Sequence, residues 1–159
     1  MAQGGWDAYY ASLSMAMADV RPIVVGVDGS PASLAALEWA AGQGTLTGAP
    51  LEVVMSWEWP TSFGWALPLP DYDPAGDAGR ILDEATQKVR TAHPGLEVRT
   101  SVIEGHPAPS LIEASKAASL LVVGSRGHGE FAGMLLGSVS EHCVTNAHCP
   151  VVVVRGSDG

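Results

Sequence analysis

The chain has 159 residues, of which 47% are hydrophobic, so it is long enough for one well-buried core and too short for two ordinary domains. Its formal net charge of -9, from 8 basic and 17 acidic residues, argues against nucleic-acid and anionic-membrane partners. The sequence shows no membrane-spanning run and no secretory signal pattern, and its 2 cysteines fit a reducing compartment. We therefore expect a cytoplasmic protein with one domain.

The first 19 residues differ from the rest of the chain. Trp6, Tyr9, Tyr10, Leu13 and Met17 recur at the spacing of one helical face. This pattern fits a short docking helix, and it fits a leader or a frayed tail equally well. We treat residues 1–19 as an N-terminal extension and expect the folded domain to span residues 20–159.

The first strand and the turn after it form a candidate ligand site. Pro22 to Val27, PIVVGV, is a β-branched run typical of a strand buried on both faces of a parallel sheet. Ser30 and Pro31 then predict the start of a helix, with Leu34, Leu37 and Ala41 facing inward. Asp28 lies where open α/β sheets bind ligands, and its carboxylate can accept hydrogen bonds from a ribose or a base. Capping of the turn is the alternative role of Asp28.

The middle of the chain predicts two more strands. Leu51 to Trp57 is the second, and the aromatic, proline-rich segment Trp57 to Pro74 predicts an ordered loop that lies on the domain. Its aromatic side chains suit packing of the loop as well as stacking on a base. A helix from Ala78 to Ala92 and a third strand from Leu96 to Ile103 follow. His106 comes next, as a solvated turn residue or as a ligand neighbour.

The stretch from Leu120 to Ser140, LLVVGSRGHGEFAGMLLGSVS, is the most informative part of the sequence. Its apolar start predicts a fourth strand, and the glycines after it permit positive φ and a close approach of backbone N–H groups to a phosphate. Ser138 would open a helix that runs to Ala147, and the N-terminus of a helix favours an anion. The pattern therefore predicts a strand, an anion-binding loop and a helix.

The C-terminal residues predict a fifth strand, from Pro150 to Arg155. Its bare run Val151 to Val154 would form an exposed edge that invites pairing with a second chain. The pairs His142-Cys143 and His148-Cys149 hold the ligand types of a zinc site. Because adjacent residues of a helix point about 100° apart and a buried cysteine is an ordinary small hydrophobe, we predict no metal site.

The glycine spacing carries a resemblance to a known family. Gly124, two residues, Gly127, nine residues and Gly137-Ser138 resemble the nucleotide-binding signature of the universal stress protein family, in its ATP-binding-motif type. The flanking LLVVG and CPVVVV match that family's pattern too, and the resemblance runs from about Val20 to Arg155. The loop is not a Walker A sequence, because no Gly-Lys-Ser/Thr follows.

This resemblance implies an α/β fold: a doubly wound five-stranded parallel sheet with strand order 3-2-1-4-5 and helices on both faces, like the adenine-nucleotide α-hydrolases. In that order strands one and four are neighbours, so the turn after strand one and the glycine loop meet at one crevice. The resemblance also implies dimerisation through the last strand. The candidate nucleotide-binding residues are Gly26, Asp28, Ser56 with its backbone beside the base, Gly124, Arg126, Gly127, His128, Gly129, Gly137, Ser138 and Val139.

The implied function is an ATP-binding regulatory protein of the stress response, with or without Mg²⁺. We predict binding rather than catalysis, since the sequence offers no Walker B or similar element to hold a metal. Two departures from the family's pattern favour AMP or cyclic AMP as alternative ligands: Met134 stands where ATP-binding members often carry a basic residue, and Glu130 adds a negative charge inside the loop. A dimeric interaction protein that binds no nucleotide is the alternative function.

Overall fold

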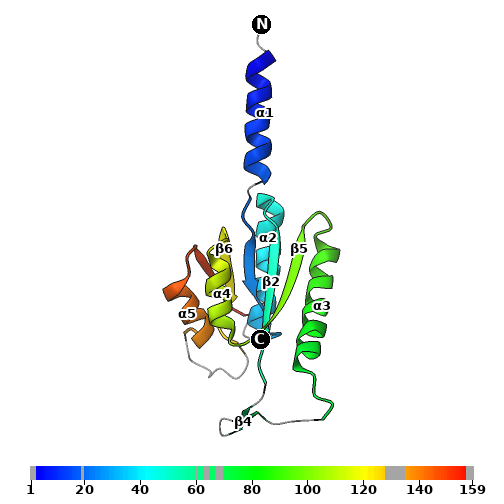
Figure 1. Cartoon of the computed structure of the whole chain (residues 1–159), viewed down its shortest axis with the longest axis vertical. Helices are drawn as coiled ribbons and strands as arrows, with labels where there is room; N and C mark the ends of the chain where they lie inside the picture. The colour runs from blue at the N-terminus through cyan, green and yellow to red at the C-terminus, as the bar shows by residue number, and fades with distance from the viewer. Residues whose placement is uncertain are drawn as a thin grey trace.

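The computed structural model describes residues 3–18, 20–59, 61–62, 65–66, 70–127 and 135–156. Among these residues, five strands form one sheet flanked by helices (Figure 1). The strands of the sheet are β1 (Ile23–Gly26), β2 (Leu51–Trp57), β5 (Val98–Glu104), β6 (Leu120–Gly124) and β7 (Val151–Val154). The helices are α1 (Gln3–Ala18), α2 (Pro31–Thr47), α3 (Pro74–Ala92), α4 (Pro107–Ser115) and α5 (Ser138–Asn146).

The order of strands in the sheet is β5-β2-β1-β6-β7, and every neighbouring pair is parallel. This is the predicted order 3-2-1-4-5, so the predicted fold class is confirmed. β1 pairs with β2 on one side and with β6 on the other, in the register Val25 to Val53 and Val25 to Val122. β2 and β5 lie on one side of β1, whereas β6 and β7 lie on the other, so the order of the strands switches between β1 and β6. Open α/β sheets form their ligand crevice at such a switch point.

Both faces of the sheet are buried. Successive side chains of a strand point to opposite faces, and the described core residues accordingly form two clusters. Val25 and Val53 belong to the cluster under α2 and α3, whereas Val24 and Val54 belong to the cluster under α4 and α5. Burial on both sides explains why these strands read as continuous apolar runs in the sequence.

The inward face of α2 differs in part from the prediction. Leu37 and Ala41 are buried as predicted, but Leu34 is 40% exposed. Ala36 and Ala40 take the inward positions instead, and their small side chains bring the helix close to the sheet. Alanine and leucine occur all around this helix, so the sequence pattern does not select one face.

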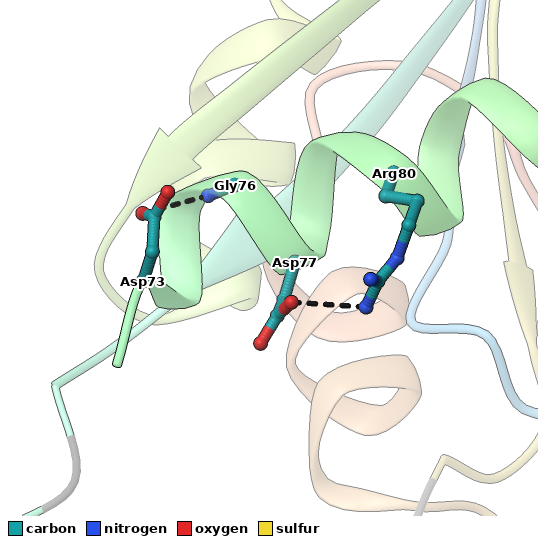
Figure 2. A network of polar contacts seen from close by, with 4 residues as sticks. All are labelled: Asp73, Gly76, Asp77 and Arg80. Atoms are coloured by element: carbon teal, nitrogen blue, oxygen red, sulfur yellow. Dashed lines mark hydrogen bonds and ion pairs between the residues drawn. The ribbon is translucent and has the colours of Figure 1, made fainter. Parts of the chain in front are cut away.

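The helix α3 begins one turn before the predicted start at Ala78. Asp73 caps it by accepting a hydrogen bond from the backbone N–H of Gly76, at 3.0 Å, and Pro74 occupies the first turn (Figure 2). Asp77 then pairs with Arg80 one turn further on, at 2.9 Å (Figure 2). Both aspartates of this turn lie on the surface, far along the chain from the predicted ligand site.

The segment from Trp57 to Pro74 holds a small antiparallel hairpin of β3 (Thr61–Ser62) and β4 (Trp65–Ala66), which the sequence analysis did not predict. Figure 1 shows β4 beyond the end of the main sheet rather than on it. Trp57 packs against the core. The ring of Trp59 stands edge-on to the ring of Trp57, with the two centroids 5.6 Å apart. Strands of two residues are too short to produce a recognisable alternation, which is why the pattern showed only a loop.

The predicted N-terminal helix is present as α1, and Figure 1 shows it extending away from the sheet. Trp6, Tyr9 and Tyr10 contact one another, with ring centroids 6.0 to 6.4 Å apart, and all three are more than half exposed. A docking partner for this helix stays a prediction. Among the described residues, no helix combines the length and the apolarity needed to cross a membrane.

Gly124 allows the start of α2 to pack against the end of β6. A Cβ atom at residue 124 would lie 2.8 Å from both the carbonyl carbon of Ala32 and the nitrogen of Ser33. We expect Gly124→Ala to lower the free energy of unfolding by about 1–3 kcal/mol, because backbone atoms must move. Gly79→Ala in α3 is the matched control: nothing lies within 4 Å of its added Cβ, so a gain of up to about 1 kcal/mol is expected. Urea unfolding measures both, and equal stability of the two variants would contradict this packing role.

Candidate nucleotide site at the sheet switch point

A cavity of about 320 Å³ opens at the carboxyl ends of β1, β2 and β6. The first residues of α4 and α5 complete its wall. The described site residues that the sequence predicted all line it: Gly26, Asp28, Ser56, Gly124, Arg126, Gly127, Gly137, Ser138 and Val139. His128, Gly129, Glu130 and Met134 lie outside the described residues.

The apolar part of the cavity wall was missed by the sequence analysis. Val54, Pro107, Leu111 and Val123 line the cavity together with the predicted residues. In the sequence they are indistinguishable from core residues, and Leu111 and Val123 are in fact almost fully buried. Only the packing of α4 against β1 and β2 turns them toward a ligand space. The site therefore combines an apolar wall with a polar rim, as small-molecule pockets usually do.

Asp28 organises the turn between β1 and α2. Its Oδ1 accepts a hydrogen bond from the backbone N–H of Ser30 at 2.8 Å, and its own N–H donates to Ser33 Oγ at 3.2 Å. Ser33 Oγ in turn donates to the carbonyl of Ser30 at 3.0 Å. These bonds hold the Asp28 side chain at the cavity wall, so turn capping and a ligand role are compatible in this geometry.

Hydrogen bonds hold the two ends of the loop after β6 together. The N–H of Gly137 donates to the carbonyl of Ser125 at 2.7 Å, and Ser140 Oγ donates to the same carbonyl at 3.0 Å. The N–H of Ser125 donates to Val154 at 2.8 Å, which links the loop to β7. These contacts place the first turn of α5 beside the end of β6. N–H groups in that turn have no intrahelical acceptor, and together with the helix dipole they favour an anion.

The described glycines of the site leave room for neighbouring atoms rather than adopting a positive φ angle. Among the described residues, glycines with positive φ are Gly29, Gly48 and Gly105, at 82°, 75° and 118°. A Cβ at Gly26 would lie 2.7 Å from Leu111 Cδ1, and one at Gly127 would lie 2.5 Å from Asp28 Oδ2. These two glycines therefore lie close to side chains of the protein itself, and the predicted close approach to a phosphate stays a prediction. The predicted use of positive φ does not extend to the described glycines of the loop.

His106 points away from the cavity. It stands just before α4 with its side chain 77% exposed, and its Nδ1 lies 3.3 Å from an oxygen of Glu58. The cavity wall does not include it, whereas the neighbouring groove between α4 and α5 does. The structure thus agrees with the solvated-turn alternative for this histidine.

The sequence model of the universal stress protein family matches residues 19–155 of this chain. The chain belongs to the universal stress protein family. The match covers the whole sheet and the cavity, and it begins just after α1. The family suggested by the glycine spacing is therefore confirmed by a comparison that covers most of the sequence.

Two mycobacterial proteins are among the curated relatives of this chain. The chain is 36% identical over 142 residues to universal stress protein Rv2623 of Mycobacterium tuberculosis, which covers 86% of this chain and 48% of the relative. A universal stress protein of Mycolicibacterium smegmatis is 38% identical over 136 residues, covering 84% of this chain and 45% of the relative. The chain thus spans about half the length of the curated relatives it matches.

Solved structures of the family share this fold. A universal stress protein in complex with cAMP superposes with a TM-score of 0.66 at 29% identity, covering 86% of this chain and 98% of that one. The universal stress protein from Archaeoglobus fulgidus in complex with dAMP gives 0.60 at 25% identity, covering 84% and 97%. UspA from Lactobacillus plantarum, at 0.71 and 23% identity, covers 86% and 98% and supports the fold alone.

The two cysteines are free and lie outside the cavity wall. Cys143 is fully buried in the cluster under α4 and α5, and this burial raises its pKa to about 11. Burial also raises the pKa of the half-buried Cys149. No group of three or more His, Cys, Asp and Glu side chains placed to hold a metal ion occurs among the described residues. Cys143 is thus a core residue of the helical layer, as one would expect of a small hydrophobe.

Native Cys143 should resist alkylation at pH 8, because the reactive thiolate is scarce at a raised pKa and the sulfur is inaccessible. Cys149 should react first, since part of it reaches the surface. Iodoacetamide labelling followed by peptide mass spectrometry distinguishes the two, and denatured protein serves as the control in which both react. Equal native labelling rates would show that the helical layer opens readily.

Proposed function

We propose that this member of the universal stress protein family binds an adenine nucleotide in the cavity at the switch point. One observation carries the proposal: the cavity joins Asp28 to the N-terminus of α5, two features more than a hundred residues apart in the sequence. The carboxylate of Asp28 suits a ribose, and the N-terminus of α5 suits a phosphate. Relatives solved with cAMP and dAMP support an adenine nucleotide as the ligand class.

The order of the strands suggests how such a nucleotide would lie. The base would lie toward β2, against the apolar surface of Val54 and Leu111. The ribose would meet Asp28 after β1, and the phosphate would reach Gly127 and Ser138 beyond β6. In this arrangement backbone N–H groups carry the phosphate interaction, so a chain with a net charge of -9 can still hold an anion.

ATP, with or without Mg²⁺, is the ligand that the glycine signature favours. AMP and cyclic AMP are the alternatives, since the relatives' ligands are monophosphates and Glu130 adds negative charge to the loop. We propose that binding serves regulation in a stress response in the cytoplasm, and that chemistry on the nucleotide is slow or absent. A dimeric interaction protein without nucleotide is the competing function.

Calorimetric titration of ATP, AMP and cyclic AMP into nucleotide-stripped protein tests this proposal. Asp28→Asn should weaken binding about 10-fold or more, because one carboxylate oxygen that accepts from the ribose becomes an amide donor. The variant can still accept the hydrogen bond of Ser30. Asp77→Asn is the matched control, because this residue lies on the surface of α3 and pairs only locally, within its own helix turn, with Arg80 (Figure 2).

A folded wild-type protein that takes up none of these nucleotides, and that releases none on denaturation, would contradict the proposal. The interaction-protein alternative would then stand, with Glu130 and Met134 as the sequence reasons. Equal loss of affinity in the Asp28 and Asp77 variants would place the nucleotide elsewhere.

We also propose that two copies of the chain pair through β7. This strand lies at one end of the sheet, and its sequence is four valines without a charge. The opposite edge strand, β5, carries exposed Arg99 and Glu104, which discourage pairing. The bonds from Leu121 to Pro150 and from Ser125 to Val154 direct alternate residues of β7 toward β6. Val151 and Val153 therefore direct their backbone groups outward.

Val153→Pro should convert the dimer to a monomer, because it removes an outward N–H group without touching the bonds to β6. Val153→Thr retains that N–H group and a β-branched shape, so it should leave the dimer intact. Sedimentation velocity of the full chain measures both variants. A dimeric Val153→Pro protein, or a monomeric wild type, would rule out pairing through this edge.

A further inference from the structure

Ser56 has a buried hydroxyl that nothing in the described part of the chain satisfies. Its Oγ is shielded from solvent and has no hydrogen-bond partner among the described residues. Ser56 lies one residue before the end of β2, and it lines the cavity. Buried polar groups in proteins nearly always have a partner, so such an orphan calls for an explanation.

Other buried hydroxyls of this domain do have partners. Thr86 Oγ1 donates to the carbonyl of Leu82 at 2.8 Å, and Ser115 Oγ donates to Ile112 at 2.6 Å. Ser140 Oγ donates to Ser125 at 3.0 Å. The fold thus satisfies these three hydroxyls within the chain, including that of Ser140, which also lines the cavity. Ser56 is the one residue of the cavity wall whose hydroxyl is buried without a partner among the described residues.

The position of Ser56 in the sheet relates it to the base of a bound nucleotide. Alternation along β2 places its side chain on the same face as Val54, which belongs to the cluster under α4 and α5. β1 lies between β2 and β6, so Ser56 is two strands away from the phosphate loop, on the order of 10 Å. A nucleotide that places its phosphate at α5 and its ribose at Asp28 brings its base to this position.

We propose that the Ser56 hydroxyl hydrogen-bonds the edge of the nucleotide base and is a specificity-determining residue of the site. This inference rests on the proposed function. The neighbouring wall is formed by the apolar side chains of Val54 and Leu111, so a polar base edge finds few other side-chain partners there. A hydroxyl can both donate to a ring nitrogen and accept from an exocyclic amino group. A site with such a group binds a base that pairs with it better than one that leaves it unpaired.

Ser56→Ala separates this role from a structural one. Because the hydroxyl has no partner in the part of the chain that the structure describes, its removal should leave urea stability unchanged or raised. The same change should weaken AMP binding about 3- to 10-fold, the range for loss of one hydrogen bond. Ser115→Ala is the matched control with the opposite expectation: it loses the bonds of Ser115 to Ile112 and His148, so stability should fall while AMP affinity remains.

Calorimetric titration of AMP into the wild-type chain and both variants decides the outcome. Weaker binding by Ser56→Ala at undiminished stability supports the inference. Wild-type affinity in Ser56→Ala overturns it and leaves the proposed function intact, whereas a wild type that binds no nucleotide overturns the proposed function itself. A fall in the stability of Ser56→Ala equal to that of Ser115→Ala also overturns the inference, because the hydroxyl would then have a structural partner.

Discussion

The candidate site depends on one close contact, in which the backbone of Gly124 lies against the backbone of Ala32 and Ser33. This contact seats the first turn of α2 on the end of β6. It thereby brings the turn that carries Asp28 beside the loop that carries Gly127, where an added Cβ would lie 2.5 Å from Asp28 Oδ2. Parallel pairing of β1 with β6 supplies the framework, and the glycines permit the final approach.

The electrostatic interactions of this protein act over short distances. The chain is acidic overall, and its described ion pairs lie on the surface, where solvent screens them. The proposed anion would be accommodated instead by the N-terminus of α5, which the hydrogen bond between Gly137 and Ser125 holds beside the end of β6. Backbone dipoles act over a short distance, so a binding site for a negative ligand is compatible with an acidic surface.

The cavity and the helix α2 show which features the sequence patterns predicted and which they did not. Strand order and the placement of Asp28 and Ser138 followed from the family resemblance, and the structure brings these residues together. The apolar wall at Leu111 did not follow, because a leucine in an amphipathic helix looks the same whether it faces a core or a ligand. The inward face of α2 was also misassigned at Leu34, since its apolar residues surround the helix.

The sequence by itself predicted the five strands of the main sheet and the family, because apolar runs and glycine spacing are local properties of the chain. It also determined which residues could serve a nucleotide. Tertiary structure alone decided which neighbours those residues acquired. Asp28 lies beside Gly127 and Leu111 lies over Gly26, whereas the hydroxyl of Ser56 has no partner among the residues that the structure describes. Such relations depend on how helices seat on the sheet, and packing between distant segments leaves no periodic signal in the sequence.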